Sequence, residues 1–423
     1  MQKKQIFILG GGISGLSLAY FLSGKSDVFD IHLIEKSARA GGCIDSDNST
    51  GFFFEKGPRV FRASTSPAFL KLASEIGMDQ EMIFSQAIGK YVWREGKLHK
   101  TPQLSWQLVK GIFKEWRVEP LIGEDESVWD FACRRFNPAV AQAIFDPMVR
   151  GVYGGAMEEI SIKSGFPRLK ALEEQYGSVI KGLLKAPRTK GPSLFSFQRG
   201  MKSLIRRLEE RISAQFHYEE EVLAIQQAGE GFTIKTSKGS YSADYLFSAL
   251  PCHVIGKLLI PQLSQVSLRG TTLVHLGYPN PVLKKKGFGY LVSSQEDDDV
   301  LGVIFVSNAF PQFNRSSEET RLTVMLKSDD LGEDEARALA LKALKRHLKV
   351  SQPPAVSLVL RAPKVFPQFK VGHGKLIQGI ESTLRSKFPR LRLVGNYLEG
   401  PGVNDCIARA QSVAESFLST PAS

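Results

Sequence analysis

A cluster of glycines near the start of the chain, GGGISG at residues 10–15, has the spacing of a dinucleotide-binding loop. In this pattern Gly10 permits a tight turn, Gly12 lets the backbone approach a pyrophosphate, and Gly15 lets the following helix pack on the preceding strand. Ser14 stands at the start of that helix, where unpaired N–H groups favour an anion. These residues predict a binding site for a dinucleotide cofactor.

An acidic residue that could hold a ribose follows at the expected distance. Glu35 ends a second apolar stretch, residues 31–34, about 20 residues after the last glycine of the loop. A carboxylate in this place accepts hydrogen bonds from the ribose hydroxyl groups. The order of strand, glycine turn, helix, strand and acid is the one that a dinucleotide fold requires.

A second group of glycines and cations follows the acid and favours FAD over NAD. Its members are Lys36, Arg39, Gly42, Gly57 and Arg59. An NAD-binding domain has no standard need for such a cluster. A flavin does, because its isoalloxazine ring must thread beside the backbone.

The composition of the chain limits the classes of protein to which it can belong. Its 423 residues exceed what one hydrophobic core usually fills, so two or three domains are expected. No run of about 18 apolar residues is present, which argues against a membrane-spanning helix. The net charge of +12 favours anionic partners, and the lack of a zinc finger, RNP motif or long basic run makes nucleic acid the weakest of these.

The cysteines and histidines predict neither a metal site nor a catalytic nucleophile. The four cysteines lie far apart with no CxxC pair, and the seven histidines form no HExxH motif. A reducing cytoplasm is the simplest location for such a chain. The pattern is consistent with chemistry carried by a cofactor, so no catalytic side chain and no metal ligand is assigned.

The succession of these patterns predicts an α/β fold: a Rossmann-like FAD-binding domain with a helical domain and a mixed-sheet substrate domain inserted into it. The FAD-binding domain is expected to combine residues 1–65, 196–252 and 376–423. Helical periodicity with few strand signals assigns residues 66–195 to the helical domain. Strand-like runs assign residues 253–375 to the substrate-binding domain.

Four motifs, GGGISGL, EKSARAGG, EKGPR and VGNYLEGPGVNDCIARA, together resemble those of the flavin amine oxidase superfamily. Interior motifs, among them DPMVRGVYGGAMEEISIKSGFP, GFGYLVSS and RLTVMLK, narrow the resemblance to the oxygen-dependent protoporphyrinogen oxidase family of haem synthesis. The resemblance spans nearly the full length, with the motifs in the same order. It implies an FAD-dependent oxidoreductase.

The resemblance also implies which residues hold FAD. These are Gly10, Gly12, Ser14, Gly15, Glu35, Lys36, Arg39, Gly42, Gly57, Arg59, the backbone of Val222, Gly395, Gly402, Val403 and Asn404. For Gly395 to Asn404 a physical argument agrees. A glycine-rich turn before a helix N-terminus can place N–H groups near the flavin pyrimidine, where reduction builds negative charge.

In this family a porphyrinogen lies in an apolar slot in front of the flavin. The resemblance places four residues in the slot: Gly154, Leu291, Leu301 and Met325. Gly154 would let the macrocycle approach the backbone. Each of the three apolar side chains has an alternative role as an ordinary core residue.

Porphyrinogens carry carboxylates, so a cation is expected to anchor them, preferably an arginine. Arg94 is the first candidate, with Lys97 next. Arg150 matches a family motif, but it is interpreted as half of a structural ion pair between domains.

Residues 104–118, LSWQLVKGIFKEWRV, have the pattern of a basic amphipathic helix. Two tryptophans and a phenylalanine recur at helical spacing, and lysines and an arginine fall on another face. Such a helix can lie in a membrane interface or pack between domains. The resemblance favours the first role, and with it a protein peripheral to the inner, cytoplasmic face of the cell membrane.

The implied reaction is the FAD-dependent oxidation of protoporphyrinogen IX to protoporphyrin IX in three two-electron steps, with oxygen as the acceptor and hydrogen peroxide as a product. One alternative is the oxidation of coproporphyrinogen III to coproporphyrin III. Others are an oxidation of the amine oxidase or desaturase type and a flavin-binding partner protein without turnover. The chain could also form a homodimer.

Overall fold

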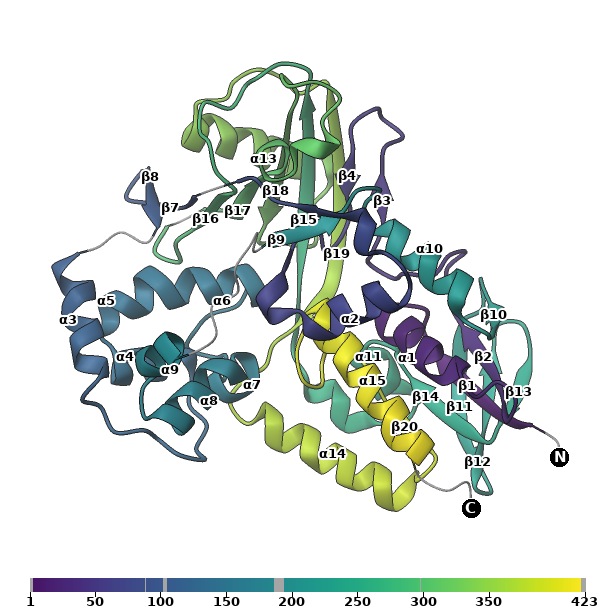
Figure 1. Ribbon diagram of the computed structural model, residues 1–423. Coiled ribbons are helices and arrows are strands. Elements are labelled where there is room, and N and C mark those ends of the chain that lie inside the picture. The colour runs from purple at the N-terminus through teal and green to yellow at the C-terminus, as the bar shows by residue number, and fades with distance from the viewer. Residues whose placement is uncertain (1–2, 88, 102–104, 186–193, 297, 420–423) are drawn as a thin grey trace.

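The computed structural model describes residues 3–87, 89–101, 105–185, 194–296 and 298–419 (Figure 1). A parallel sheet of five strands forms the lower right of the view in Figure 1. Its strands, in spatial order, are β10 (Gln215–His217), β2 (Phe29–Ile34), β1 (Lys4–Leu9), β14 (Tyr245–Ser248) and β20 (Leu391–Leu393). Three distant parts of the chain therefore build one sheet.

Both faces of this sheet are buried, as the continuous apolar run of β1 requires. Ile6 and Ile8 face one layer, and Phe7 and Leu9 face the other. The first layer holds the helices α1 (Ile13–Ser23), α2 (Pro67–Glu75), α10 (Lys202–Arg211) and α15 (Val403–Ser419). The second holds α11 (Cys252–Leu258), η4 (Pro261–Gln265), α14 (His373–Lys387) and the small sheet β11 (Val222–Ala228), β12 (Gly231–Thr236) and β13 (Ser240–Ala243).

A mixed sheet of seven strands forms the upper part of the molecule (Figure 1). Its strands, in spatial order, are β19 (Val356–Pro367), β15 (Leu268–Tyr278), β18 (Thr320–Leu326), β17 (Val300–Phe305), β16 (Gly289–Val292), β7 (Lys90–Arg94) and β8 (Lys97–Thr101). Helix α13 (Glu333–Leu348) covers one face through Ala336, Ala340 and Leu344. The other face is turned toward the rest of the molecule.

The helical region lies at the lower left of Figure 1 and has its own core. Its elements are α3 (Trp106–Glu115), α4 (Val128–Arg135), α5 (Pro138–Val140), the π-helical turn η3 (Ala141–Phe145), α6 (Asp146–Tyr153), α7 (Ile162–Gly165), α8 (Pro167–Tyr176) and α9 (Val179–Lys185). The remaining short elements are β3 (Ser46–Asp47), β4 (Phe54–Glu55), β5 (Phe61–Arg62), η1 (Ala63–Thr65), η2 (Asp79–Glu81), β6 (Met82–Phe84), β9 (Leu194–Phe197), α12 (Val306–Ala309) and η5 (Pro311–Phe313).

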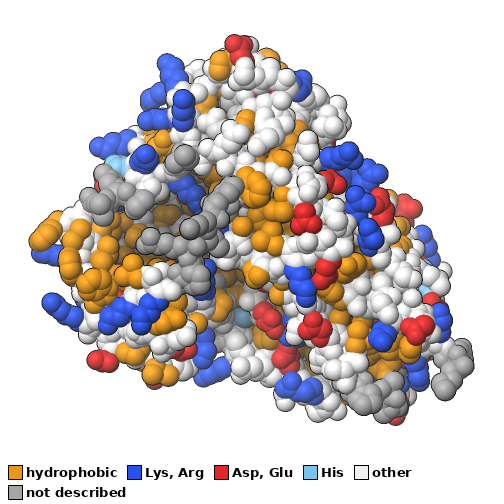
Figure 2. Space-filling view, in the orientation of Figure 1, with side chains coloured by type: hydrophobic (Ala, Val, Ile, Leu, Met, Phe, Trp, Pro, Cys, Tyr) orange, Lys and Arg blue, Asp and Glu red, His pale blue; other side chains and the backbone are white. Residues whose placement is uncertain are grey.

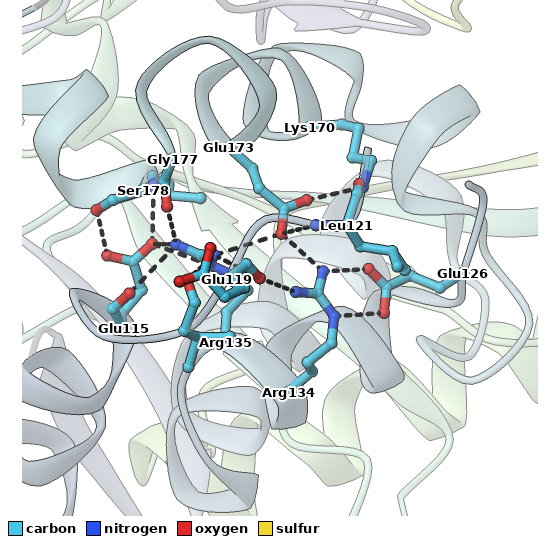
Figure 3. A network of polar contacts seen from close by, with 12 residues as sticks. Glu115, Glu119, Leu121, Glu126, Arg134, Arg135, Lys170, Glu173, Gly177 and Ser178 are labelled. Atoms are coloured by element: carbon cyan, nitrogen blue, oxygen red, sulfur yellow. Dashed lines mark hydrogen bonds and ion pairs between the residues drawn. The ribbon is translucent and has the colours of Figure 1, made fainter. Parts of the chain in front are cut away.

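A network of buried charges joins the helices of this region (Figure 3). Arg135 pairs with Glu115, and both side chains are fully buried. Glu173, also buried, accepts hydrogen bonds from Arg134 at 2.8 Å and from Lys170 at 2.7 Å. Although burial opposes ionisation, these two cations hold the pKa of Glu173 below its usual range. Each of these buried charges therefore lies beside a group of opposite charge in the same network.

The expected α/β class is confirmed, but residues 66–101 do not belong to the helical region. Helix α2 packs beside α15, strand β6 pairs with β9, and the β7–β8 hairpin joins the seven-stranded sheet. The hairpin turns at Glu95 and Gly96, which both have positive φ, as a two-residue type I′ turn requires. No helix among the described residues is long and apolar enough to span a bilayer.

Candidate active site

The glycine loop leaves β1 and enters α1 as the sequence predicts. A Cβ atom on Gly15 would lie 2.0 Å from the carbonyl oxygen of Gly10, so only glycine lets helix and loop approach this closely. In contrast, apart from the two chain neighbours of Gly12, no atom of the described residues lies within 4 Å of a Cβ placed on this residue, which precedes α1. The loop is therefore packed tightly behind the helix N-terminus and open in front of it, which fits a pyrophosphate.

Glu35 lies at the end of β2, and its side chain points back to the loop. One carboxylate oxygen accepts the N–H of Gly11 at 2.8 Å, and the other accepts the N–H of Ser37 at 2.8 Å. The backbone of Glu220 bonds to that of Glu35, which brings the start of β11, at Val222, to the same end of the sheet. Glu35 is thus held in place with oxygen lone pairs left to accept further bonds.

The second glycine cluster closes over the first. The N–H of Gly41 donates to the carbonyl of Gly11 at 2.7 Å, and a Cβ on Gly57 would lie 2.0 Å from the carbonyl oxygen of Cys43. The Arg39 guanidinium donates to the carbonyls of Ala40, Gly42 and Ile44, at 2.9 to 3.1 Å. Arg39 therefore shapes this loop, while Lys36 beside it is exposed.

The N-termini of two helices meet at this site. Ser14 at the start of α1 makes a hydrogen bond with Cys406 in the first turn of α15, where burial raises the pKa of the thiol to about 12. The positive ends of both helix dipoles therefore face the same space. The turn before α15 contains Gly395, whose Cβ would lie 2.6 Å from the ring of Tyr397.

The α15 N-terminus also supports its neighbours. The N–H of Gly402 donates to the Asp405 carboxylate at 3.1 Å. The amide oxygen of Asn404 accepts the N–H groups of Ala68 and Phe69, at 3.0 and 3.2 Å, and so caps α2. The Asn404 side chain is thereby engaged in the fold, and its backbone N–H, like that of Val403, is what remains for a cofactor.

Arg59 connects the nucleotide loops to the seven-stranded sheet. It donates to the hydroxyl of Thr323 at 2.8 Å, and that hydroxyl lies 2.9 Å from Nδ1 of His275. Burial lowers the pKa of Arg59 to about 10 and lowers that of His275 well below its usual range. Thr323 and His275 were not predicted, although each is a polar residue within an apolar strand.

The face of the seven-stranded sheet opposite α13 carries a row of apolar side chains. Cross-strand pairing aligns Leu360, Leu273, Met325, Gly302, Leu291 and Val92 across six strands. Helix α6 lies over one end: a Cβ on Gly151 would lie 3.2 Å from Leu291, and one on Gly154 would lie 3.8 Å from Leu301. The structure thus brings Gly154, Leu291 and Leu301 together and places Met325 in the same row.

Residues 13–417 match the family described as flavin containing amine oxidoreductase. This match covers nearly the whole chain. The chain belongs to the flavin-containing amine oxidoreductase family. It is accordingly an FAD-dependent oxidoreductase, as the sequence analysis predicts.

Comparison with individual proteins is consistent with this family assignment. The chain is 31% identical to protoporphyrinogen oxidase of Homo sapiens and 25% identical to coproporphyrinogen III oxidase of Staphylococcus aureus, with at least 98% of each chain covered. In fold it is similar to a putative protoporphyrinogen oxidase from Exiguobacterium, with a TM-score of 0.88, 22% identity and 99% of both chains covered. Putrescine oxidase bound to putrescine shares the fold at a TM-score of 0.72 and 15% identity, with 99% of this chain and 100% of that one covered.

In this amine oxidoreductase the predicted carboxylate anchor Arg94 lies apart from Gly154. It lines a cavity of about 370 Å³ between the β7–β8 hairpin and the helical region, together with Gln142 and Gln295. Its Nε atom lies 3.4 Å from the Glu95 carboxylate. Lys97, across the turn, is exposed. The cavity is near the outer end of the apolar row, beyond Val92.

The sequence-based interpretation of Arg150 is wrong. Among the residues that the structure describes, no carboxylate lies within ion-pair distance of its guanidinium, and its Nε has no hydrogen-bond partner. Arg150 lies in α6, one turn before Gly154. The Asp405 carboxylate of α15 adds to the effect of burial in raising the pKa of Tyr153, the last residue of α6.

Proposed function

We propose that this oxidoreductase oxidises a porphyrinogen, with protoporphyrinogen IX as the main substrate and coproporphyrinogen III as the alternative. The observation that carries the proposal is the apolar row on the inner face of the seven-stranded sheet, beside the two converging helix N-termini. A broad, apolar macrocycle matches such a surface, which is lined by leucine, methionine and valine side chains. The names of the similar proteins agree with either substrate.

We propose that the predicted residues hold FAD in the manner that their geometry allows. The pyrophosphate would lie at Gly12 and Ser14, and the ribose at Glu35. The loops of Gly42 and Gly57, with Arg59, would border the flavin, and the N-terminus of α15 would face its pyrimidine edge. When bound, FAD accepts the electrons of the substrate in two-electron steps.

The residues of the chain would then contribute position and environment. The row from Leu360 to Val92 keeps water away from the reacting face of the substrate, and α6 holds the macrocycle against it. The N–H groups at the start of α15 stabilise negative charge. No cluster of histidine, cysteine and acidic residues able to hold a metal occurs in the described part of the chain.

The direct test is anaerobic mixing of the purified, flavin-loaded protein with protoporphyrinogen IX and, separately, with coproporphyrinogen III. We expect the flavin absorbance band to bleach and porphyrin fluorescence to rise, faster with the first substrate. Readmission of oxygen should restore the flavin band and release hydrogen peroxide. A bound flavin that neither compound reduces would contradict the proposal, and the apoprotein serves as the control for spontaneous oxidation.

We also propose that α3 attaches the protein to an acidic membrane surface. Trp106 and Phe113 are 71% and 56% exposed, and Leu184 of the neighbouring α9 is 64% exposed. Figure 2 shows hydrophobic side chains gathered in this part of the surface, with lysines and arginines among them. The helix turns Leu108 and Glu115 inward, so its aromatic side is the outer one, as in an interfacial helix.

Flotation with lipid vesicles tests this attachment. The protein should float with vesicles that contain phosphatidylglycerol, and the double variant Trp106→Ser, Phe113→Ser should remain below. A double variant that floats as well as the unaltered protein would contradict the role of α3. Arg206→Ala, on the distant helix α10, is the matched control.

A further inference from the structure

Two arginines meet at the C-terminal end of α6 without an acidic partner. Arg269, from the first part of β15, donates to the carbonyl oxygen of Gly154 at 3.3 Å. Arg150 lies one turn earlier on α6, and its own carbonyl accepts the N–H of Gly154 at 3.0 Å. Among the described residues, neither guanidinium makes an ion pair within 4.0 Å.

The electrostatic surroundings leave this pair short of negative charge. The Nε atom of Arg150 is buried, and within the part of the chain that the structure describes it has no hydrogen-bond partner. Burial lowers the pKa of Arg150, and although Asp146 opposes this, the neighbouring Arg269 lowers it further. Asp146 is itself engaged, because its carboxylate accepts the N–H of Ser294 at 3.0 Å. Arg150 is partly buried and Arg269 is exposed, and an anion that bonds to both would offset the repulsion between their like charges.

The pair lies at the edge of the proposed substrate slot. Gly151 directly follows Arg150 on α6 and Gly154 lies one turn later; a Cβ on Gly151 would lie 3.2 Å from Leu291 of the apolar row, and one on Gly154 would lie 3.8 Å from Leu301. Helix α15, whose Asp405 acts electrostatically on Tyr153 of α6, contributes its N-terminus to the proposed flavin site, and the proposed pyrophosphate position at Gly12 immediately precedes α1. A ligand with an apolar body and a carboxylate at its rim would thus reach both the row and the arginines.

We propose that Arg150 and Arg269 bind a carboxylate of the substrate and set the orientation of the macrocycle in the slot. This inference rests on the proposed function and gives it a recognition element that is separate from Arg94. The planar guanidinium groups match a carboxylate in a bidentate manner, which a lysine at either place would reproduce less well. The propionate groups of either porphyrinogen have the required chemistry.

The test compares the binding of protoporphyrin IX with that of its dimethyl ester to the FAD-loaded protein, by porphyrin fluorescence anisotropy. The unaltered protein should bind the free acid more tightly than the ester. Arg269→Ala should weaken binding of the acid about tenfold and leave the ester unaffected. Arg269→Glu, which gives Arg150 an internal partner, should weaken acid binding further.

Arg206→Ala on the outer surface of α10 is the matched control, and the flavin content and melting temperature of each variant report on folding. Arg269 is exposed, so its replacement should leave both unchanged. Equal binding of acid and ester by the unaltered protein and by both Arg269 variants would overturn the inference.

The anaerobic reduction assay separates this inference from the proposed function. If the porphyrinogens reduce the flavin while the acid and ester bind equally, the function stands and the arginine site is refuted. If neither porphyrinogen reduces the flavin while Arg269→Glu abolishes the preference for the acid, the carboxylate site stands and its substrate is another amphiphilic acid.

Discussion

The helical region and the cofactor region treat buried polar groups in opposite ways. In the helical region Glu115, Arg135 and Glu173 are fully buried, and each is paired with a group of opposite charge (Figure 3). In the cofactor region the N-terminus of α1 is open at Gly12, and at the edge of the slot the Nε of Arg150 has no hydrogen-bond partner among the described residues.

This difference distinguishes polar groups that stabilise the fold from polar groups that are available to a ligand. A buried charge that is matched within the chain stabilises a particular packing and leaves nothing for a ligand. Polar groups that the fold holds in place but leaves without partners are stabilised only when something binds. The two regions should therefore respond differently to substitution: one in stability, the other in occupancy by cofactor or substrate.

The largest effect is expected at Gly15, where the cofactor region has no room to adjust. In Gly15→Ala the new Cβ would lie 2.0 Å from the backbone oxygen of Gly10, so the loop must move. We expect the purified variant to retain less than about a tenth of the normal flavin, measured by the ratio of flavin to protein absorbance. Gly24→Ala, at the other end of α1 with nothing within 4 Å, should retain its flavin.

The second-largest effect is expected in the helical region, on the stability of the protein. Glu115→Ala leaves Arg135 buried without its main partner, which should lower the free energy of unfolding by about 3 to 5 kcal/mol. Denaturant unfolding measures the change, and flavin content at low temperature should stay near normal. Glu119→Ala, which removes an exposed side chain, should cost less than about 0.5 kcal/mol. Equal stability of the Glu115 and Glu119 variants would contradict the view that the buried charges of the helical region stabilise its packing.

A smaller effect, dependent on pH, comes from Glu55, a buried acid beside the second glycine loop. Burial raises the pKa of Glu55 to about 7, even though it accepts bonds from Met201 and Ser46. Because the folded state favours the protonated form, its contribution to stability is full below pH about 4.5 and is lost as pH rises through 7. The contribution is at most about 3 kcal/mol.

Glu55→Gln should remove this dependence. The free energy of unfolding of the unaltered protein should fall between pH 5 and pH 8, whereas that of the variant should change less over the same range. Glu221→Gln, at an exposed position, is the control. Parallel curves for Glu55→Gln and the unaltered protein would mean that Glu55 is not protonated in the folded state at pH 5 to 6.

The smallest effect is expected at Arg94. Like that of Arg150, the Nε of Arg94 has no hydrogen-bond partner among the described residues, but it lies 3.4 Å from the Glu95 carboxylate, so Arg94 is a less available anchor than Arg150 and Arg269. Arg94→Ala should change the KM for protoporphyrinogen less than about threefold, against about tenfold for Arg269→Ala, with kcat preserved in both. A larger effect of Arg94→Ala than of Arg269→Ala would indicate that the substrate carboxylate binds at Arg94, in the cavity beside the β7–β8 hairpin, and would reverse the ranking of the two sites.

Local signals in the sequence were sufficient to predict the conformation of the glycine loop. Gly10, Gly12, Gly15 and Glu35 act through neighbours in one βαβ unit, so their spacing alone predicts the arrangement. The resemblance supplied Leu291, Leu301 and Met325; strand pairing places Leu291 and Met325 in one row, and Leu301 lies beside Gly154. Their roles toward the substrate remain predictions.

Features that depend on distant partners were not predictable. The β7–β8 hairpin has a clear turn at Glu95 and Gly96, yet its pairing with β16 depends on a strand almost 200 residues later. The meeting of Arg150 with Arg269 likewise requires the packing of α6 over the sheet. Single residues of this kind carry no periodic signal, and only the tertiary fold reveals that they are neighbours.

The sheet order β10-β2-β1-β14-β20 has a consequence for biosynthesis. The glycine loop is translated long before β20 and α15, the strand and helix that complete its surroundings, because almost the whole of the described chain lies between them. Until then the apolar face of β1 and α1 has no cover from α15, so the nascent chain should depend on chaperones. Flavin insertion should accordingly be a late event, and translation stalled before residue 391 should yield a chain that cannot retain FAD.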